Sequence, residues 1–131
     1  MPEVTIRHAQ GLFDSGTHKL AFGRVVREIV AQEMHIDKVT GPNPQAAQLV
    51  AGDIEVRFEE EGPHDIGGRV LQIRIEAMSF PERVASRKDI VKYISMRIRE
   101  HDYFPERARG VGPHRRPFVC LVLPEAAFEE L

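Results

Sequence analysis

The stretch GGRVLQIRIEAMSFPERVASRKDIVKYI, residues 67–94, contains the pattern of a β-strand followed by that of an α-helix. In residues 71–77 apolar and polar side chains alternate, which predicts a strand with one apolar face. Ser79 is suited to cap a helix and Pro81 to occupy its first turn. Apolar residues then recur at helical spacing over residues 84–98. The stretch therefore predicts a strand that leads directly into an amphipathic helix.

The first half of the chain shows the same pattern. Alternation over residues 4–7 and again over residues 54–59 predicts two strands. Residues 17–34 between them have a regular apolar stripe, which predicts an amphipathic helix. After the second predicted helix, a loop rich in Arg, Gly and Pro leads to an apolar run at residues 118–123, the fourth predicted strand.

The resulting element order is β-α-β-β-α-β. It predicts an α/β fold of tandem β-α-β units, with a four-stranded mixed sheet, two helices on one face and a charged opposite face. Residues 1–131 are expected to form one domain, with halves at about 1–60 and 68–124. The same order is found in the ferredoxin-like sandwich and in the tautomerase fold, and element order alone does not separate the two.

Composition narrows the class of protein. A net charge of −2 on 131 residues disfavours a general nucleic-acid binder, and no apolar stretch is long enough to span a membrane. The start of the chain lacks the pattern of a secretion signal. The single cysteine, Cys120, lies in an apolar run and is expected to be a buried structural thiol in a reducing compartment. These features predict a soluble, cytoplasmic protein without a nucleic-acid or membrane partner.

Histidines and cysteine give no sign of a metal site. The six histidines show neither an H-x-x-x-H spacing nor a C-x-x-C partner, so no metal is expected. His8 has the strand parity of Pro2, but an exposed histidine at the end of a strand is the simpler expectation.

The beginning of the chain, MPEVTIRH, carries the sharpest functional signal. Together with residues 67–94, the element order and the length, it resembles the tautomerase superfamily, most of all the branch of 5-carboxymethyl-2-hydroxymuconate isomerase. The resemblance implies a homotrimer and a cofactor-independent isomerase that interconverts enol and keto acids. It also implies that Met1 is removed and that Pro2 is the catalytic base.

Pro2 has the chemistry for that role. Once Met1 is excised, its ring nitrogen is an α-amino group, with an ordinary pKa of about 8. Burial against an apolar wall and nearby arginines disfavour the ammonium form, so the amine can take a proton beside a carbonyl and return it elsewhere. The candidate residues that hold the substrate carboxylate are Arg83, Arg57 and Arg74.

Two positions depart from the family pattern. The closest alignment places Glu82 where the family has an arginine, with Arg83 one residue later, and Glu55 rather than Arg57 at the second such position. Two alternatives therefore stay open. One is a ferredoxin-like binding or regulatory module without catalysis, and the other is a tautomerase-fold trimer that has lost activity. A further interpretation is that Arg57 and Arg74 are cross-strand partners of Glu55, Glu59 and Glu76, either solvated or in a subunit interface.

Overall fold

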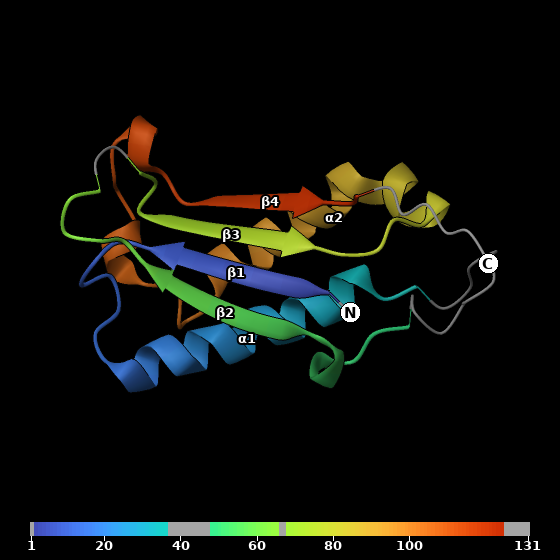
Figure 1. Cartoon of the computed structure of the whole chain (residues 1–131), viewed down its shortest axis with the longest axis horizontal. Coiled ribbons are helices and arrows are strands. Elements are labelled where there is room, and N and C mark those ends of the chain that lie inside the picture. The colour runs from blue at the N-terminus through green and yellow to red at the C-terminus, as the bar shows by residue number, and fades with distance from the viewer. Residues whose placement is uncertain (1, 37–47, 66–67, 125–131) are drawn as a thin grey trace, which may run out of the picture.

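Four strands and two long helices form more than half of the described part of the chain (Figure 1). The computed structural model describes residues 2–36, 48–65 and 68–124. The strands are β1 (Glu3–His8), β2 (Glu55–Glu60), β3 (Leu71–Glu76) and β4 (Phe118–Val122). The helices are α1 (Gly16–Met34) and α2 (Pro81–Glu100), with short 3-10 turns η2 (Ala51–Asp53), η3 (Glu106–Ala108) and η4 (Pro113–Arg115). The β-α-β-β-α-β order is confirmed.

The strand pairing separates the two folds that share this order. The sheet order is β2-β1-β3-β4, with β1 parallel to β2, β3 parallel to β4, and β1 antiparallel to β3. The two strands of each β-α-β unit are therefore direct neighbours. In the split arrangement of the ferredoxin-like sandwich another strand lies between them. The pairing therefore excludes that fold and leaves a mixed four-stranded sheet of two β-α-β units.

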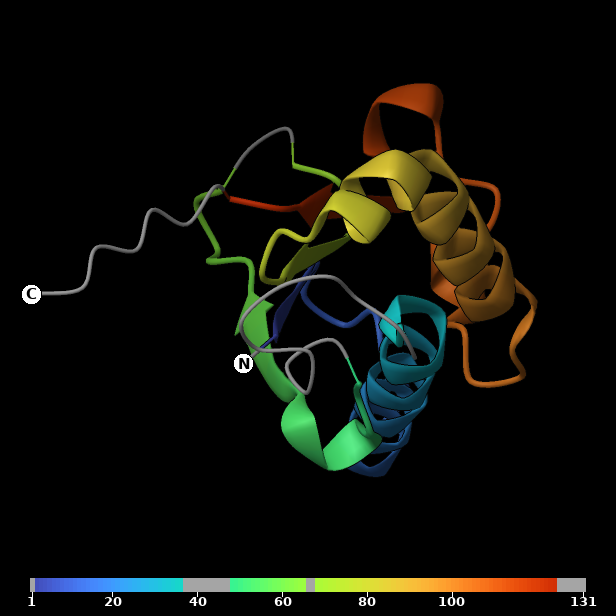
Figure 2. The same cartoon turned by 90° about the vertical axis from the view of Figure 1, so that its right-hand side faces the viewer.

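Both helices cover one face of the sheet, as Figure 2 shows. Strand residues that point to this face are buried, among them Val4 and Ile6 of β1 and Ile73 and Ile75 of β3. Residues of the alternate parity, such as Thr5, lie on the other face, which has no described helix over it. The predicted two-layer arrangement with one open, charged face is confirmed.

The helix starts follow local capping chemistry. The backbone N–H of His18 donates to Ser15 Oγ at 3.1 Å, so Ser15 is the N-cap and α1 begins one residue before the predicted Thr17. The predicted cap of α2, Ser79, is wrong by one residue. Phe80 holds the cap position without a side-chain hydrogen bond, because Pro81 already supplies the backbone angle of a first helical residue.

The fourth strand lies at an edge of the sheet, and this corrects the prediction for Cys120. The residue is half-buried rather than buried, because it pairs with Arg74 and therefore lies on the open face of an edge strand. Among the described helices, none combines the length and the apolar character that crossing a membrane requires.

Candidate functional site

Pro2 directly precedes β1 and is buried. Its carbonyl accepts a hydrogen bond from the backbone N–H of Glu55 at 3.2 Å, which ties the start of β1 to the start of β2. The register pairs Glu3 with Glu55 on β2 and with Glu76 on β3. Extended by one residue to Pro2, this register places Ile54 on one side of Pro2 and Ala77 on the other. These two flanking residues are only 3% and 5% exposed. The start of the chain is therefore held in the middle of the sheet, in apolar surroundings.

One end of each helix lies at the same end of the sheet as Pro2. In Figure 1 the last turn of α1 and the first turn of α2 both lie towards the right-hand end of the sheet, the end at which β1 starts. Pro2 has the strand parity of Val4, whose side chain is fully buried under the helices. The ring of Pro2 therefore belongs to the helix side of the sheet.

Arg83 lies at this end and is fully buried. Its Nη1 donates to the carbonyl of Met78 at 2.9 Å, while Nε and Nη2 donate to the carbonyl of Met34 at 3.4 and 3.3 Å. Its guanidinium also lies over the ring of Phe80, 4.9 Å from the centroid. Met78 immediately follows Ala77, so a short piece of backbone connects Arg83 to the flank of Pro2.

The contacts of Arg83 have an electrostatic consequence. Met34 is the last residue of α1, and a cation is stabilised at this negative end of a helix. The hydrogen bonds of the guanidinium all go to backbone carbonyls, and no described carboxylate forms an ion pair with it. Burial lowers the pKa of Arg83 from the ordinary value of a guanidinium. The candidate site thus contains a buried positive charge at the end of the sheet where β1 begins.

Arg57 and Arg74 occupy the open face of the sheet. They are the two cross-strand neighbours of Thr5, one on β2 and the other on β3. Arg57 Nε donates to Glu55 at 2.8 Å and Arg74 Nη2 donates to Glu76 at 2.9 Å. The hydrogen bond that Arg57 donates to Glu55 is the main cause that raises the pKa of Arg57. Both arginines are thus paired with glutamates of their own strands, whereas the sequence predicted pairs across strands; a cross-strand contact joins Arg57 to Glu3 at 4.0 Å.

Of the four predicted site residues, two lie at the same end of the sheet and two on its open face. Pro2 and Arg83 lie at one end of the sheet and on its helix side. Arg57 and Arg74 lie together on the opposite face. The flanking residues Ile54 and Ala77 were not singled out from the sequence, because strand register depends on pairing between distant segments.

His8 corrects an expectation. The sequence predicted an exposed residue at the end of a strand, but His8 is only 2% exposed. The rings of Phe13 and Phe58 cover it, at centroid distances of 5.0 and 6.2 Å. Its Nδ1 lies 3.0 Å from the carbonyl of Ala9, while its Nε2 is buried without a hydrogen-bond partner among the described residues. His8 is therefore part of the core at the far end of β1 from Pro2.

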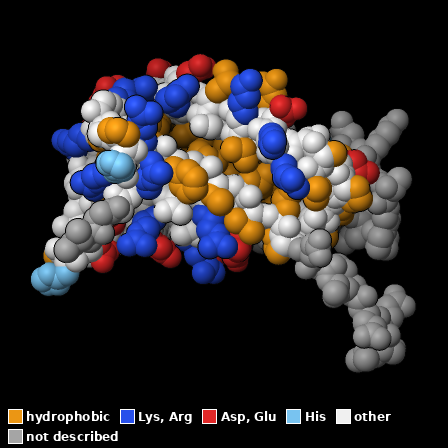
Figure 3. Space-filling model, turned by 90° about the horizontal axis from the view of Figure 1, so that it is seen from above, with side chains coloured by type: hydrophobic (Ala, Val, Ile, Leu, Met, Phe, Trp, Pro, Cys, Tyr) orange, Lys and Arg blue, Asp and Glu red, His pale blue; other side chains and the backbone are white. Residues whose placement is uncertain are grey.

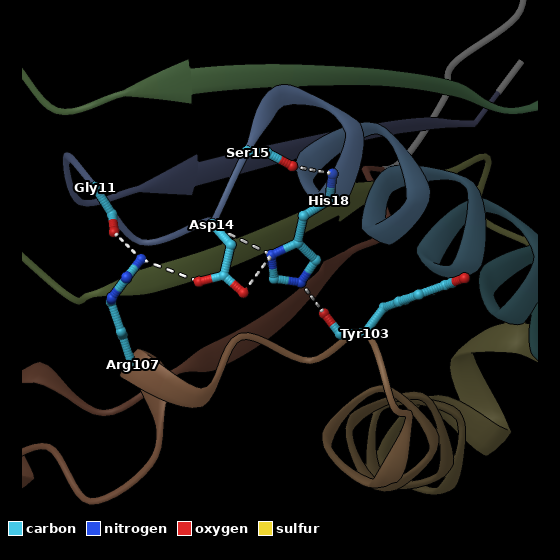
Figure 4. A network of polar contacts seen from close by, with 6 residues as sticks. All are labelled: Gly11, Asp14, Ser15, His18, Tyr103 and Arg107. Atoms are coloured by element: carbon cyan, nitrogen blue, oxygen red, sulfur yellow. Dashed lines mark hydrogen bonds and ion pairs between the residues drawn. The ribbon is translucent and has the colours of Figure 1, made fainter.

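A cluster of Ser15, Asp14 and His18 contains the residue types of a catalytic triad but not its geometry (Figure 4). Ser15 Oγ accepts from the backbone of His18 and not from its ring. The ring Nδ1 accepts the backbone N–H of Asp14 at 3.1 Å, and Nε2 lies 2.8 Å from the carbonyl of Tyr103. Arg107 adds an ion pair to Asp14 at 3.2 Å. Both ring nitrogens are engaged, so the cluster joins two loops and does not activate a nucleophile.

Two further predictions concern the absence of a metal site and the removal of Met1. Within residues 2–36, 48–65 and 68–124, no three His, Cys, Asp or Glu side chains group closely enough to hold a metal ion. Met1, whose removal the resemblance implies, lies outside the described residues.

Comparison with known proteins identifies the fold. No protein-family model matches the sequence, and no curated protein is significantly similar. Pt0534, solved after inactivation by 2-oxo-3-pentynoate, is 19% identical, with a TM-score of 0.56 over 98% of this chain and 90% of that one. A fused 4-OT asymmetric trimer is 11% identical, with a TM-score of 0.57 over 94% and 86% of the two chains. Malonate semialdehyde decarboxylase is 12% identical, with a TM-score of 0.50 over 97% and 90%.

These structural neighbours are tautomerase-superfamily members. At such low identities the similarity establishes the fold and leaves the branch of the superfamily open. The chain therefore has the tautomerase fold, built from two adjacent β-α-β units.

Proposed function

We propose that this chain is a cofactor-independent tautomerase or isomerase of enol and keto acids, in which Pro2 is the general base and general acid. The observation that supports this most directly is the position of Pro2, buried at the start of a central strand between Ile54 and Ala77. After removal of Met1, this position places a secondary amine in a largely apolar setting. Such a setting favours the neutral amine, the form that accepts a proton.

The arginines have different parts in this proposal. Arg83 supplies a fixed positive charge behind Pro2, which further disfavours the ammonium form. Arg57 and Arg74 lie on the face opposite to the ring of Pro2, so they are assigned to the substrate carboxylate only across a subunit boundary, where they would face Pro2 of a neighbouring subunit. Their present partners are exposed glutamates of the same strand. Exposed pairs of this kind contribute at most about 1 kcal/mol, so an incoming carboxylate can displace them.

Two structural neighbours support the choice of chemistry. Pt0534 is inactivated by 2-oxo-3-pentynoate, a 2-oxo acid with a conjugated triple bond. The structures of malonate semialdehyde decarboxylase include a mutant in which a proline at its first position is replaced by alanine. Both are consistent with a reactive first residue in proteins of this fold. For the present chain, that residue is Pro2.

Labelling by 2-oxo-3-pentynoate tests the proposal. The free amine of Pro2 is expected to add across the triple bond, which forms one N–C bond and moves one proton to carbon. Intact-mass analysis should show a gain equal to one molecule of the acid, and peptide mapping should place it on the first residue. A chain that keeps Met1 has an amide at this nitrogen and is the matched control, since it is expected to stay unlabelled. An absence of labelling in a chain that begins at Pro2 would contradict the proposal.

We also infer that the protein is a homotrimer that assembles through its open sheet faces. Two structural neighbours are described as trimers of fused 4-OT. The open face carries both signs of charge, with Glu3 and Glu55 beside Arg57. A surface of this kind can pair with another copy of itself.

The trimer is expected to have three times the chain mass of 14.9 kDa in light scattering after size exclusion. Thr5→Arg, at the centre of the open face between two arginines, should shift the mass towards one subunit by charge repulsion. Arg87→Gln, on the exposed side of α2, should leave the trimer intact. A single-chain mass for the native protein would refute the assembly. An intact trimer that 2-oxo-3-pentynoate fails to label would instead favour the inactive tautomerase-fold alternative.

A further inference from the structure

A cavity of about 400 Å³ lies at the end of the sheet opposite to Pro2. It is lined by the first residues of β3 and β4, the last turns of α2 and the loop between α2 and β4. Leu71, which lines it, pairs with His8 at the far end of β1. Five strand residues, or about 17 Å, therefore separate this end of β1 from its start. The cavity is a different place from the proposed catalytic site.

The inner part of the cavity is apolar. Ile73, Ile98 and Phe104 line it, and each of them is at most 5% exposed. Half-buried Val119 from the edge strand completes this apolar surface. The cavity volume falls within the range of roughly 300 to 1,000 Å³ that is typical of small-molecule sites, whose walls are mostly apolar.

Three arginines also line the cavity. Arg109 is fixed in place, because its guanidinium lies 4.7 Å from the ring of Phe104 and its Nη2 donates to the carbonyl of Arg99 at 2.7 Å. The side chains of Arg99 and Arg116 have neither an ion pair nor a hydrogen bond with any described residue. No aspartate or glutamate is among the described residues that line the cavity. The face in Figure 3 shows hydrophobic surface bordered by Lys and Arg side chains.

This combination selects one kind of ligand. An apolar wall stabilises a hydrocarbon body, while unpaired guanidinium groups stabilise an anion and prefer a planar carboxylate, which they can hold with two parallel hydrogen bonds. A cation would be repelled, and a neutral apolar molecule would gain nothing from the arginines. We propose that this cavity, between the last turns of α2 and the first residues of β4, binds a small apolar molecule with one carboxylate group, through Arg99 and Arg116. This assignment does not depend on the proposed isomerase activity.

Isothermal titration with octanoate, octanol and acetate tests both parts of the ligand. Octanoate is expected to bind saturably with one site per chain. Octanol should bind about tenfold to a hundredfold more weakly, because it lacks the charge-assisted hydrogen bonds. Acetate lacks the apolar body and should show no saturable binding. Equal affinities for octanoate and octanol, or no saturable binding of octanoate, would overturn the proposal.

Variants identify the site. The double variant Arg99→Gln and Arg116→Gln should lose about tenfold or more in octanoate affinity, while its affinity for octanol stays the same. Arg87→Gln removes a positive charge from the same helix, outside this cavity, and should bind octanoate as the native protein does. Ser95→Trp places an indole on the half-buried lining of the cavity and should abolish binding of both octanoate and octanol, with an unchanged melting temperature.

Pro2→Ala separates this proposal from the catalytic one. Octanoate should bind the Pro2→Ala protein with the affinity of the native protein, whether or not the native protein is an isomerase. A loss of octanoate binding in Pro2→Ala, with normal binding in the double arginine variant, would place the ligand at the first residue. That result would overturn the assignment of the cavity.

Discussion

Pro2→Ala is expected to lower kcat/KM for the ketonisation of phenylenolpyruvate by about a hundredfold, the lower end of the usual contribution of general acid–base catalysis. Alanine keeps an amine at the chain start but loses the ring, so the nitrogen can rotate and become solvated. Retention of Met1 before Pro2 should have a larger effect, about 10⁴-fold, because an amide nitrogen has no basic lone pair. Spectrophotometry of enol decay measures both losses.

The control is a proline far from the site. Pro113 is exposed in η4, at the opposite end of the sheet, and Pro113→Ala should keep native kcat/KM. The pH dependence distinguishes a base from a merely structural residue. If the amine is the base, kcat/KM rises with pH as the ammonium form loses its proton. The pH at which this rise occurs should shift when proline is replaced by alanine. Equal rates for the native protein and Pro2→Ala, or no ketonisation by either, would remove the claim for this class of substrate.

The strands and helices could be predicted from sequence because their signals are local. Alternation in residues 71–77 and helical spacing in residues 84–98 depend only on which face of each element is buried. The choice between the tautomerase and ferredoxin-like folds required more. Both have the same element order, and only the direct pairing of β1 with β2 separates them. That pairing joins segments about fifty residues apart, so no local pattern specifies it.

The candidate site could be predicted only in part, because several of its contacts join distant segments of the chain. The glutamates Glu55 and Glu76 were expected as partners of Arg57 and Arg74, but across strands; the pairs join residues two apart on one strand, which alternation places on the same face. The burial of His8 was missed because it depends on Phe13 in a loop and Phe58 on another strand. The environment of Arg83 was missed for a related reason. Its main partner, the carbonyl of Met34, is fixed by how the two helices meet.

Arg83→Ala is expected to lower the free energy of unfolding by about 3 kcal/mol or more. The substitution removes the donors of the buried carbonyl of Met34 and the half-buried carbonyl of Met78, at about 1–3 kcal/mol for each buried group left unpaired. It also opens a void beside Phe80, on which the guanidinium lies. Urea denaturation followed by circular dichroism measures the loss. Arg87→Ala, one turn further along α2 and exposed, should change the stability by less than about 0.5 kcal/mol.

A second substitution tells whether hydrogen bonds or volume stabilise this end of the helices. Burial lowers the pKa of Arg83, which means that bringing its charge into the protein opposes folding. Arg83→Met removes that cost and fills much of the space, but it leaves both carbonyls unpaired. If the carbonyls need the guanidinium, Met should still destabilise the protein, by about 1–2 kcal/mol. Stability equal to or above that of the native protein would show that the hydrogen bonds only offset the burial of the charge. The reason for an arginine at this position would then be the positive potential that it gives Pro2. The rate of ketonisation by Arg83→Met, a folded protein without that charge, would measure the effect of this potential.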